Sequence, residues 1–313
     1  MSDEVNEEET DEEETEDDEE EEATAEVQEA APGPNAEATQ VVSEGTQAVV
    51  LKLKQDQTPA QKLELKLDYV KTNALKMALR ITKALGSEDV TCKYDGNLHI
   101  RQMNSSRTTL IDAVIDMGAG LEKLEQPSAP QRTFTVNIGG FLRFLKDSQP
   151  QLNIDQADMI IVDKRYNGTV TATLPLLEDS DETIPDPKMP LGISASLNLD
   201  EIMTGLRRLS EEPESLNFIA ENGSLTIKGG NSQMQKIEFS QLKTDMTSAN
   251  GQAGYALPLL KALGKATYKI SYATDMPMKA IHVITTTEYE GTKSVDKRVG
   301  IITVWMAPRI LQE

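Results

Sequence analysis

Two hairpin signals recur along the chain at nearly constant spacing, and this internal repeat restricts the fold more than any other feature of the sequence. Asp95-Gly96 lies between two runs of alternating apolar and polar residues, and Asn222-Gly223 occupies the same place 127 residues later. A second pair of turns, Asn167-Gly168 and Glu290-Gly291, is separated by 123 residues. A repeat of this length indicates that one architectural unit occurs twice, so the chain should fold into two related halves.

Each half is predicted to contain two helices and otherwise mainly strands. Apolar periodicity places the helices at about Thr72–Leu85, Gly139–Asp147, Leu199–Leu209 and Leu257–Gly264. Alternation or β-branched residues indicate strands that include His99–Met103, Thr169–Leu174, Lys236–Phe239 and Val299–Met306. This order favours antiparallel sheets, so the predicted fold class is α+β.

Composition sets the expected boundaries of the two halves. Residues 1–45 form an acidic tail, which cannot bury enough apolar surface to fold and should be disordered. Residues 46–62 form an extension in which Gln47–Leu53 alternates enough for an extra strand. The halves then span residues 63–177 and 191–313. Between them, the prolines of residues 178–190 indicate an extended connector that crosses the surface.

The formal net charge of -21 lies almost entirely in the tail. Residues 1–50 contain 20 acidic and no basic residues, which leaves 32 acidic against 31 basic residues in the rest of the chain. The nearly neutral body is therefore compatible with a nucleic-acid partner. The tail itself could occupy a basic channel as a mimic of DNA, a hypothesis tested by deleting residues 1–45 and measuring DNA loading at low salt.

Each predicted helix has an apolar stripe and basic residues on the opposite side. These basic residues are Lys76, Arg80, Lys83, Arg143, Lys146, Arg207, Arg208, Lys261 and Lys265. Solvated faces often contain such residues, so any single helix could be an ordinary surface helix. Acidic residues are nearly absent from all four faces, however, and four basic faces on one surface would bind phosphates without reading bases.

The sequence contains no convincing catalytic or metal-binding constellation. His99 and His282 fall in predicted strands without neighbouring ligands, and the glycines around Gly118 lack the context of a dinucleotide loop. The single cysteine, Cys92, excludes an intramolecular disulfide and fits a reducing compartment. No membrane span or signal peptide is apparent. We therefore expect an intracellular protein without enzymatic activity or cofactor, which would be cytoplasmic and nucleoid-associated in an archaeal or viral source and nuclear in a eukaryotic one.

Several segments of the body resemble the proliferating cell nuclear antigen family of DNA sliding clamps, and look closest to its archaeal members. The similarity runs from about Leu65 to Glu313. The motifs that support it are Trp305-Met306-Ala307-Pro308-Arg309-Ile310, Asp275-Met276-Pro277-Met278-Lys279, Gln102-Met103-Asn104-Ser105-Ser106 with Leu110, and Leu174-Pro175-Leu176-Leu177.

The resemblance implies a DNA-clamp fold in which three subunits form a ring, with the helices on the inner face and antiparallel sheets outside. The ring-closing strands would be about Gly168–Leu174 of one subunit and Ser232–Phe239 of the next, with interface residues Gly168, Val170, Ala172, Leu174, Met234, Lys236 and Glu238. A pocket under the connector would take a short helical turn of a partner, with a wall of Met103, Leu110, Ile184, Pro185, Pro277, Trp305, Ala307 and Pro308. Arg107 and Thr108 depart from the family beside this pocket, so partner preference could differ.

The implied function is a processivity factor that encircles double-stranded DNA and docks replication and repair enzymes. Its partners would be duplex DNA, further copies of itself as a homotrimer, a clamp loader, and a polymerase, ligase or nuclease with pocket-binding motifs. Alternatives remain open: a subunit of a heterotrimeric clamp, a monomeric viral factor, or a clamp-like regulator that binds partners without loading on DNA. The size of the purified protein separates the first two from a homotrimer.

Overall fold

The computed structural model describes the body of the chain and leaves the tail and nearly all of the extension outside the described residues. The described residues are 62–121, 132–145, 149–165, 167–179, 184–232, 235–242, 250–290 and 293–309. The predicted extra strand at Gln47–Leu53 therefore lies outside them.

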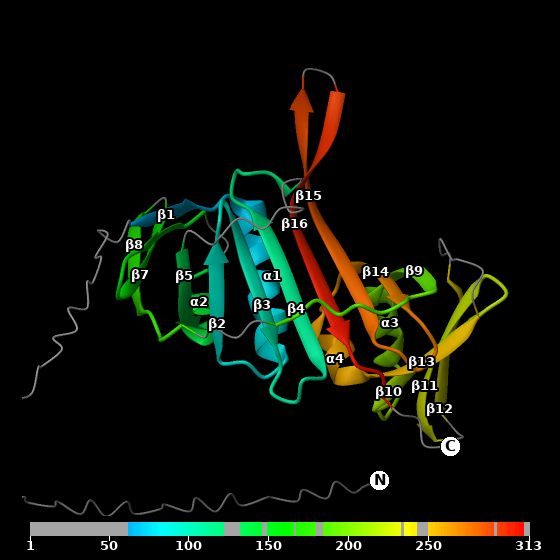
Figure 1. The fold of residues 1–313 in the computed structure, drawn as a ribbon. Helices are drawn as coiled ribbons and strands as arrows, with labels where there is room; N and C mark the ends of the chain where they lie inside the picture. The colour runs from blue at the N-terminus through cyan, green and yellow to red at the C-terminus, as the bar shows by residue number, and fades with distance from the viewer. Residues whose placement is uncertain are drawn as a thin grey trace, which may run out of the picture. The chain divides into compact units, whose positions relative to one another are not determined.

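The first half of the chain alternates strands and helices in an order that the second half repeats (Figure 1). The first half consists of β1 (Leu63–Lys66), α1 (Tyr69–Ala84), β2 (Asp89–Tyr94), β3 (Asn97–Met103), β4 (Thr109–Asp116), β5 (Arg132–Asn137), α2 (Ile138–Phe144), β6 (Gln151–Ile154), β7 (Asp158–Arg165) and β8 (Gly168–Pro175). The second half consists of β9 (Ile193–Asn198), α3 (Leu199–Leu206), β10 (Ser215–Glu221), β11 (Ser224–Ser232), β12 (Gln235–Leu242), β13 (Gly251–Ala256), α4 (Leu257–Ala262), β14 (Thr267–Tyr272), β15 (Met278–Glu290) and β16 (Lys293–Met306). Corresponding elements are therefore β1 and β9, α1 and α3, and so on to β8 and β16.

The described strands form three sheets with antiparallel pairing throughout. One half supplies a sheet of order β1-β6-β7-β8, and the other a sheet of order β12-β11-β10-β13. The third, eight-stranded sheet has the order β5-β2-β3-β4-β16-β15-β14-β9, so the pairing of β4 with β16 joins the two halves. The predicted α+β fold with antiparallel sheets is confirmed.

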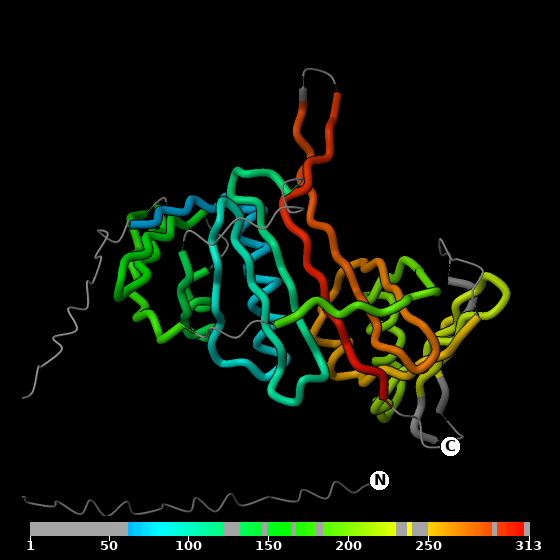
Figure 2. The backbone as a smooth tube through the Cα atoms, viewed as in Figure 1, coloured from blue at the N-terminus to red at the C-terminus, as the bar shows by residue number. Residues whose placement is uncertain are grey.

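The helices cover one face of the sheets and create the core there. Helix α1 contacts β2, β4, β15 and β16 of the eight-stranded sheet and also touches α2 and α4. Side chains alternate along β4, so Ile111 and Ala113 are fully buried toward the core while Asp112 points to the opposite face. We call that opposite face of the eight-stranded sheet the outer face. The described end of the connector crosses in front of these strands toward β9 (Figure 2).

Polar side chains cap three of the helices, and α1 begins at Tyr69, three residues before its predicted start. Asp68 accepts a hydrogen bond from the Lys71 N–H at 2.8 Å at the start of α1, and Asn137 accepts one from the Gly140 N–H at 2.9 Å at α2. Asn198 caps α3 in the same way, whereas α4 begins after Ala256 without a side-chain cap and has a proline in its first turn.

Three helices end two or three residues earlier than predicted: α2 ends at Phe144, α3 at Leu206 and α4 at Ala262. Helix α3 stops at Leu206, because the N–H groups of Arg208 and Leu209 bond three residues back instead of four, as in Arg208 N–H to Gly205 O at 3.0 Å. Helix α4 stops at Ala262, and Gly264 follows with a φ of +76° that ends the helical path. Arg207, Arg208 and Lys265 therefore lie on turns after the helices.

The β15–β16 hairpin is longer than its counterpart in the first half. Strands β7 and β8 have 8 residues each, whereas β15 has 13 and β16 has 14. From the pair Thr285–Arg298 to the pair Glu290–Lys293, the two strands pair only with each other among the described strands. We call residues 285–298 the arm, which projects beyond the sheet (Figure 1).

Candidate nucleic-acid interface and docking pocket

Helix α1 contains three of the predicted DNA-contacting cations, and they are not equally accessible. Arg80 and Lys83 are exposed, as expected for the side of the helix turned away from the sheet. Lys76 is only 9% exposed, which differs from the expectation of a solvated side chain. Helix α1 also contacts α2 and α4, so part of its surface faces other helices instead of solvent.

The cationic side of α1 continues onto α2. The Lys83 Nζ lies 3.8 Å from the position that a β-carbon on Gly139 would take, which puts it beside the first turn of α2. Arg143 is exposed in the last turn of the same helix. Lys146, the other cation predicted on this helix, lies outside the described residues. The first half therefore brings at least three exposed cations onto two adjacent helices.

The cations of the second half are partly neutralised by carboxylates. Lys261 on α4 forms an ion pair with Glu212, and the Lys265 Nζ lies 3.2 Å from the Asp200 Oδ1. Arg207 and Arg208 are exposed on the turn after α3. The sequence could not predict the Glu212 contact, because Glu212 is 49 residues away from Lys261.

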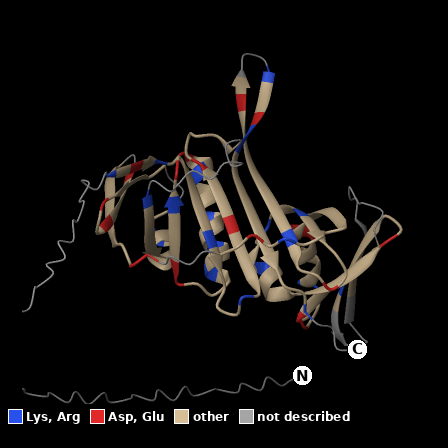
Figure 3. Cartoon of the chain, in the orientation of Figure 1, with Lys and Arg blue, Asp and Glu red and all other residues tan. Residues whose placement is uncertain are grey.

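The described helices thus form a surface with more positive than negative charge. Helices α1, α2 and α4 contain no acidic residue, as Figure 3 also shows for α1, the longest of them. Within the described part of the chain, no carboxylate forms an ion pair with Arg80, Lys83, Arg143, Arg207 or Arg208. Exposed cations of this kind attract a phosphate backbone without selecting a sequence.

Part of the predicted docking pocket is assembled by strand pairing on the outer face. Met103 on β3 pairs with Leu110 on β4, and Leu110 pairs with Trp305 on β16. We call these three side chains the docking row. Trp305 in turn pairs with Lys279 on β15, whose Nζ lies 5.0 Å from the centre of the indole ring. Leu110 is 3% exposed, so the row has an apolar floor.

The remaining predicted wall residues come from the connector, the loop before β15 and the residues after β16. Pro277 directly precedes Met278, which pairs with Met306, and so Pro277 and Ala307 extend the same strand pair. The Ala307 N–H donates to Thr108 O at 2.7 Å, which ties the chain end to the loop after β3. Pro308, Ala307, Pro277 and Ile184 are half-buried, whereas Pro185 is exposed.

Arg101 is a residue of this region that the sequence patterns did not single out. It lies on the outer face of β3, two residues before Met103, and its guanidinium bonds to Asp112 on β4 and to the connector. The connector atoms are 83 and 85 residues away along the chain, so no local pattern could reveal the contact. The signal available was an arginine paired across two strands with an aspartate.

The described residues provide no constellation for catalysis or metal binding. No group of three or more His, Cys, Asp or Glu side chains among them could hold a metal ion. Cys92 is fully buried, and burial raises the pKa of its thiol to about 12, so it is not a ready nucleophile. His99 bonds to Asp95 at 2.9 Å, and His282 bonds to the Thr267 carbonyl. None of the described helices is both long and apolar enough to cross a membrane.

Comparisons with known proteins agree with this geometry. No family model matches the chain. The DNA polymerase sliding clamp of Thermococcus gammatolerans is 23% identical over 226 residues, which cover 67% of this chain and 84% of that protein. The crystal structure of proliferating cell nuclear antigen from Thermococcus kodakaraensis superposes with a TM-score of 0.62 at 14% identity, over 80% of this chain and 100% of the other.

The chain has the sliding-clamp fold. The PCNA2-PCNA3 complex of Sulfolobus tokodaii gives a TM-score of 0.61 at 18% identity, over 79% of this chain and 99% of that chain. A structure of the C-terminal region of FEN-1 bound to A. fulgidus PCNA gives a TM-score of 0.60 at 13% identity, over 80% of this chain and 99% of that one. The resemblance noted in the sequence motifs is therefore confirmed by similarity to archaeal DNA polymerase sliding clamps and to PCNA structures.

Two of the sheets end in strands that have no neighbour on one side among the described strands. β8 ends the sheet β1-β6-β7-β8, and β12 ends the sheet β12-β11-β10-β13. On β8, Val170 is 41% exposed and Ala172 is 8% exposed. On β12, Glu238 is exposed, whereas the side chains of the predicted interface residues Met234 and Lys236 lie outside the described residues.

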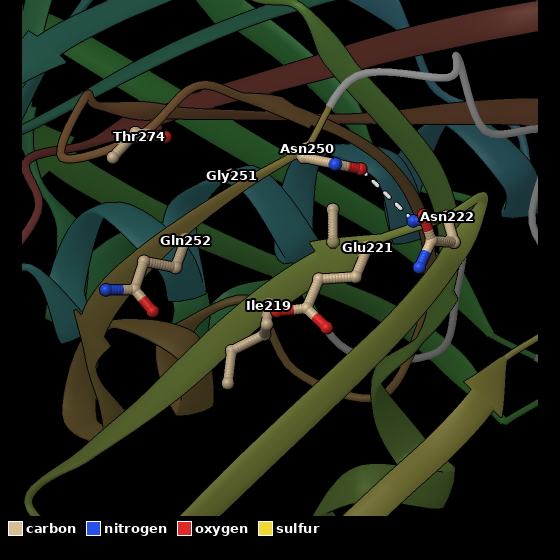
Figure 4. A pocket seen from close by; sticks show the side chains of 8 residues that line it. Ile219, Glu221, Asn222, Asn250, Gly251, Gln252 and Thr274 are labelled. Carbon is tan, nitrogen blue, oxygen red and sulfur yellow. Dashed lines mark hydrogen bonds between the residues drawn. The ribbon is translucent and has the colours of Figure 1, made fainter.

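A small hollow of the clamp fold lies between the β10–β11 turn and β13 (Figure 4). Its lining includes Glu221, Gln252 and Thr274, and the Asn222 N–H donates to the Asn250 Oδ1 at 3.1 Å across it. The lining holds one acidic and no basic side chain, so it does not suit a phosphate or another anion.

Proposed function

We propose that the chain is a DNA sliding clamp, which closes into a ring of three subunits around duplex DNA and docks other proteins in the pocket beneath its connector. Its role is topological and involves no reaction of its own. Similarity to the archaeal DNA polymerase sliding clamps supports the proposal. We further propose residues 63–177 and 191–313 as the two clamp domains, 178–190 as the connector, and a location inside the cell, where chromosomal DNA is.

Ring closure is supported best by the pairing of two strands that joins the two halves of the chain. The equivalent two strands of the repeat are not paired with each other among the described strands of the chain. β4 and β16 pair and join the two halves of one molecule. Their counterparts in the repeat are β12 and β8, which both lie at sheet edges. Pairing β8 of one molecule with β12 of the next would reproduce the same junction between subunits. Because edge strands present unpaired backbone groups, this pairing has a physical cause.

The internal junction also suggests a register for the junction between subunits. Within the chain, Val304 lies opposite Ile111, and both side chains are fully buried. When the β7–β8 hairpin is aligned with β15–β16 by its strand pairing, Ala172 takes the place of Val304. When β11–β12 is aligned with β3–β4 in the same way, Ile237 takes the place of Ile111. Val170 would then lie opposite Phe239. The same pairing would bury Val170, whose counterpart Ile302 is 0% exposed.

The mass of the purified protein tests ring closure. We expect light scattering after size exclusion to give three times the 34.4 kDa mass of one chain. Val170→Lys places an ammonium group in the proposed junction, where desolvation is costly, and should yield a folded monomer. Val295→Lys is a matched control, because Val295 is similarly exposed at 45% but lies on the arm. A trimer that tolerates Val170→Lys but dissociates with Val295→Lys would contradict the proposed junction.

A second candidate is a subunit of a heterotrimeric clamp. The similarity to the PCNA2-PCNA3 complex of Sulfolobus tokodaii favours it, because that complex contains two different chains. The open edges β8 and β12 would then pair with edges of other chains. A protein that stays monomeric at concentrations of about 100 µM, with the far-ultraviolet circular dichroism of a folded protein, would favour this candidate over the homotrimer.

Docking is proposed for the docking row and the residues beside it. The FEN-1 segment bound to A. fulgidus PCNA supports a partner of the nuclease class, and the half-buried apolar side chains of Met103 and Trp305 suit a helical turn with apolar anchors. Polymerase, ligase and clamp loader are proposed as further partners on the same grounds.

Binding of duplex DNA is proposed for the exposed cations of α1 and α2.

A further inference from the structure

The Arg101 guanidinium lies between the outer face of the eight-stranded sheet and the connector. Its Nη1 donates to the Asp112 Oδ2 at 2.7 Å, a bond between neighbouring strands. Its Nη2 donates to the Asp186 Oδ1 at 2.6 Å, and its Nε donates to the Ile184 carbonyl at 3.1 Å. One side chain thus bonds the sheet and the connector together, and we call Arg101, Asp112 and Asp186 the latch.

The latch lies directly beside the docking row. Arg101 and Met103 point to the same face of β3, two residues apart, and Asp112 follows Leu110 on β4 at the same spacing. The residue whose carbonyl Arg101 holds is Ile184, the half-buried connector residue of the predicted pocket wall. The neighbouring Pro185 and Asp186 are exposed. The latch therefore fixes the connector at the half-buried Ile184, next to two exposed residues.

The chemistry requires arginine at this position. A guanidinium offers several donors in a rigid plane, so it can bond a carboxylate on the sheet and two acceptors on the connector at once. A lysine ammonium is a single point charge and cannot reproduce this fork. Asp112 orients the plane: burial raises the pKa of Asp112 and Arg101 opposes that effect, as expected for a carboxylate partly withdrawn from water beside its cation.

We propose that Arg101 is a positioning residue for partner docking, which holds Ile184 against the docking row and so preorganises the pocket before a partner arrives. A pocket wall that is already ordered spares the partner the entropy of ordering the connector, and binding is tighter as a result. This inference rests on the proposed docking function. It adds that the latch is a determinant of affinity although Arg101 is not one of the proposed wall residues.

The experiment uses the full chain and two independent readouts. Hydrogen–deuterium exchange of the amides in residues 184–192 reports how firmly the connector is held. Fluorescence anisotropy with a labelled synthetic peptide of the FEN-1 C-terminal region reports docking. The variants are Arg101→Gln, Arg101→Lys and Asp186→Asn. The last leaves the pair of Arg101 and Asp112 intact and changes an exposed side chain, so the fold should not suffer.

A matched control is Lys93→Ala. Lys93 is an exposed cation on the neighbouring strand β2, where it lies opposite His99 of β3, and among the described residues it forms no hydrogen bond or ion pair with the connector. We expect Arg101→Gln to speed connector exchange and to weaken peptide binding about fivefold. Arg101→Lys should recover only part of both losses, Asp186→Asn should cause a smaller loss of the same kind, and Lys93→Ala should change neither.

Three outcomes would overturn the inference, and they are distinguishable from one another. Peptide that binds the wild-type protein and the Arg101→Gln variant equally well shows that Arg101 does not position the pocket, and leaves the docking function intact. Peptide that fails to bind the wild-type trimer contradicts the docking function and the role of the latch together. Unchanged connector exchange in Arg101→Gln also refutes the latch, whatever the peptide does.

Discussion

At the residue scale, Asp112 shows how burial and charge oppose each other in the latch. Burial raises the pKa of its carboxyl above the ordinary value of 3.8, and the nearby Arg101 lowers it by a smaller amount. A carboxyl with a higher pKa in the folded than in the unfolded protein binds its proton more tightly when folded. Its contribution to stability therefore becomes more favourable as the pH falls from neutral toward the unfolded pKa.

Asp112→Asn removes this titration while keeping the size and shape of the side chain. We expect the free energy of unfolding of the wild type, relative to the variant, to increase when the pH is lowered from about 7 to about 4. Urea unfolding of both proteins at the two pH values, at equal protein concentration, measures the difference. A difference that shrinks on acidification would mean that the bond to Arg101 outweighs the cost of burial.

The single residues divide clearly into those that the sequence could predict and those that it could not. The exposure of Arg80, Lys83 and Arg143 could be predicted, because the 3.6-residue period of a helix determines which side faces solvent. The burial of Lys76 could not be predicted from the sequence, because burial depends on tertiary neighbours such as the helices next to α1. The role of Arg101 depends on a connector more than 80 residues away, and no local pattern encodes that distance.

At the element scale, the strands and helix starts followed from the sequence better than the element lengths. Turn residues such as Asp95-Gly96 and Asn222-Gly223 lie between the paired strands β2–β3 and β10–β11, as predicted. Helix ends were less predictable, because a last turn tightens by hydrogen bonds that leave the apolar period unchanged. The length of the arm was not anticipated, and the comparison of β15–β16 with β7–β8 makes it evident.

The arm should contribute little to the stability of the clamp fold. All its described side chains are exposed or half-buried, and a two-stranded hairpin without a third strand is marginally stable. Replacing residues 286–297 by Asn-Gly joins the directly paired Thr285 and Arg298 through a tight turn. Differential scanning fluorimetry should give a melting temperature within about 2 °C of the wild type.

A deeper deletion provides the control for the arm. Joining the paired residues Val283 and Ile301 by the same Asn-Gly turn also removes Val299, which is 5% exposed and lies in the body of the sheet. Loss of buried apolar surface should lower the melting temperature clearly. Equal effects of the two deletions would show that the arm is part of the cooperative core.

At the scale of the whole molecule, the distribution of charge determines how a closed ring could hold DNA. On α1 and α2, Arg80, Lys83 and Arg143 form no ion pair with a carboxylate among the described residues. In the second half, Lys261 and Lys265 are paired with acidic residues. In a ring built from such subunits, the strongest positive charge would come from the helices in the first half of each subunit. Attraction to phosphates should therefore depend on the first half more than on the second.

The triple variant Arg80→Ala, Lys83→Ala and Arg143→Ala tests this distribution, and its control changes the exposed strand lysines Lys93, Lys164 and Lys269 to alanine. Both variants lose three positive charges, so a difference between them reports the position of the charges. Affinity for a linear duplex, measured by anisotropy over a range of salt, should weaken in the helix variant. The slope of log affinity against log salt should fall by about 2 to 3, because each phosphate contact releases roughly one counterion. The strand variant should keep the wild-type slope, and both should keep the wild-type mass. Equal slopes in the two variants would place the DNA elsewhere than on the helices.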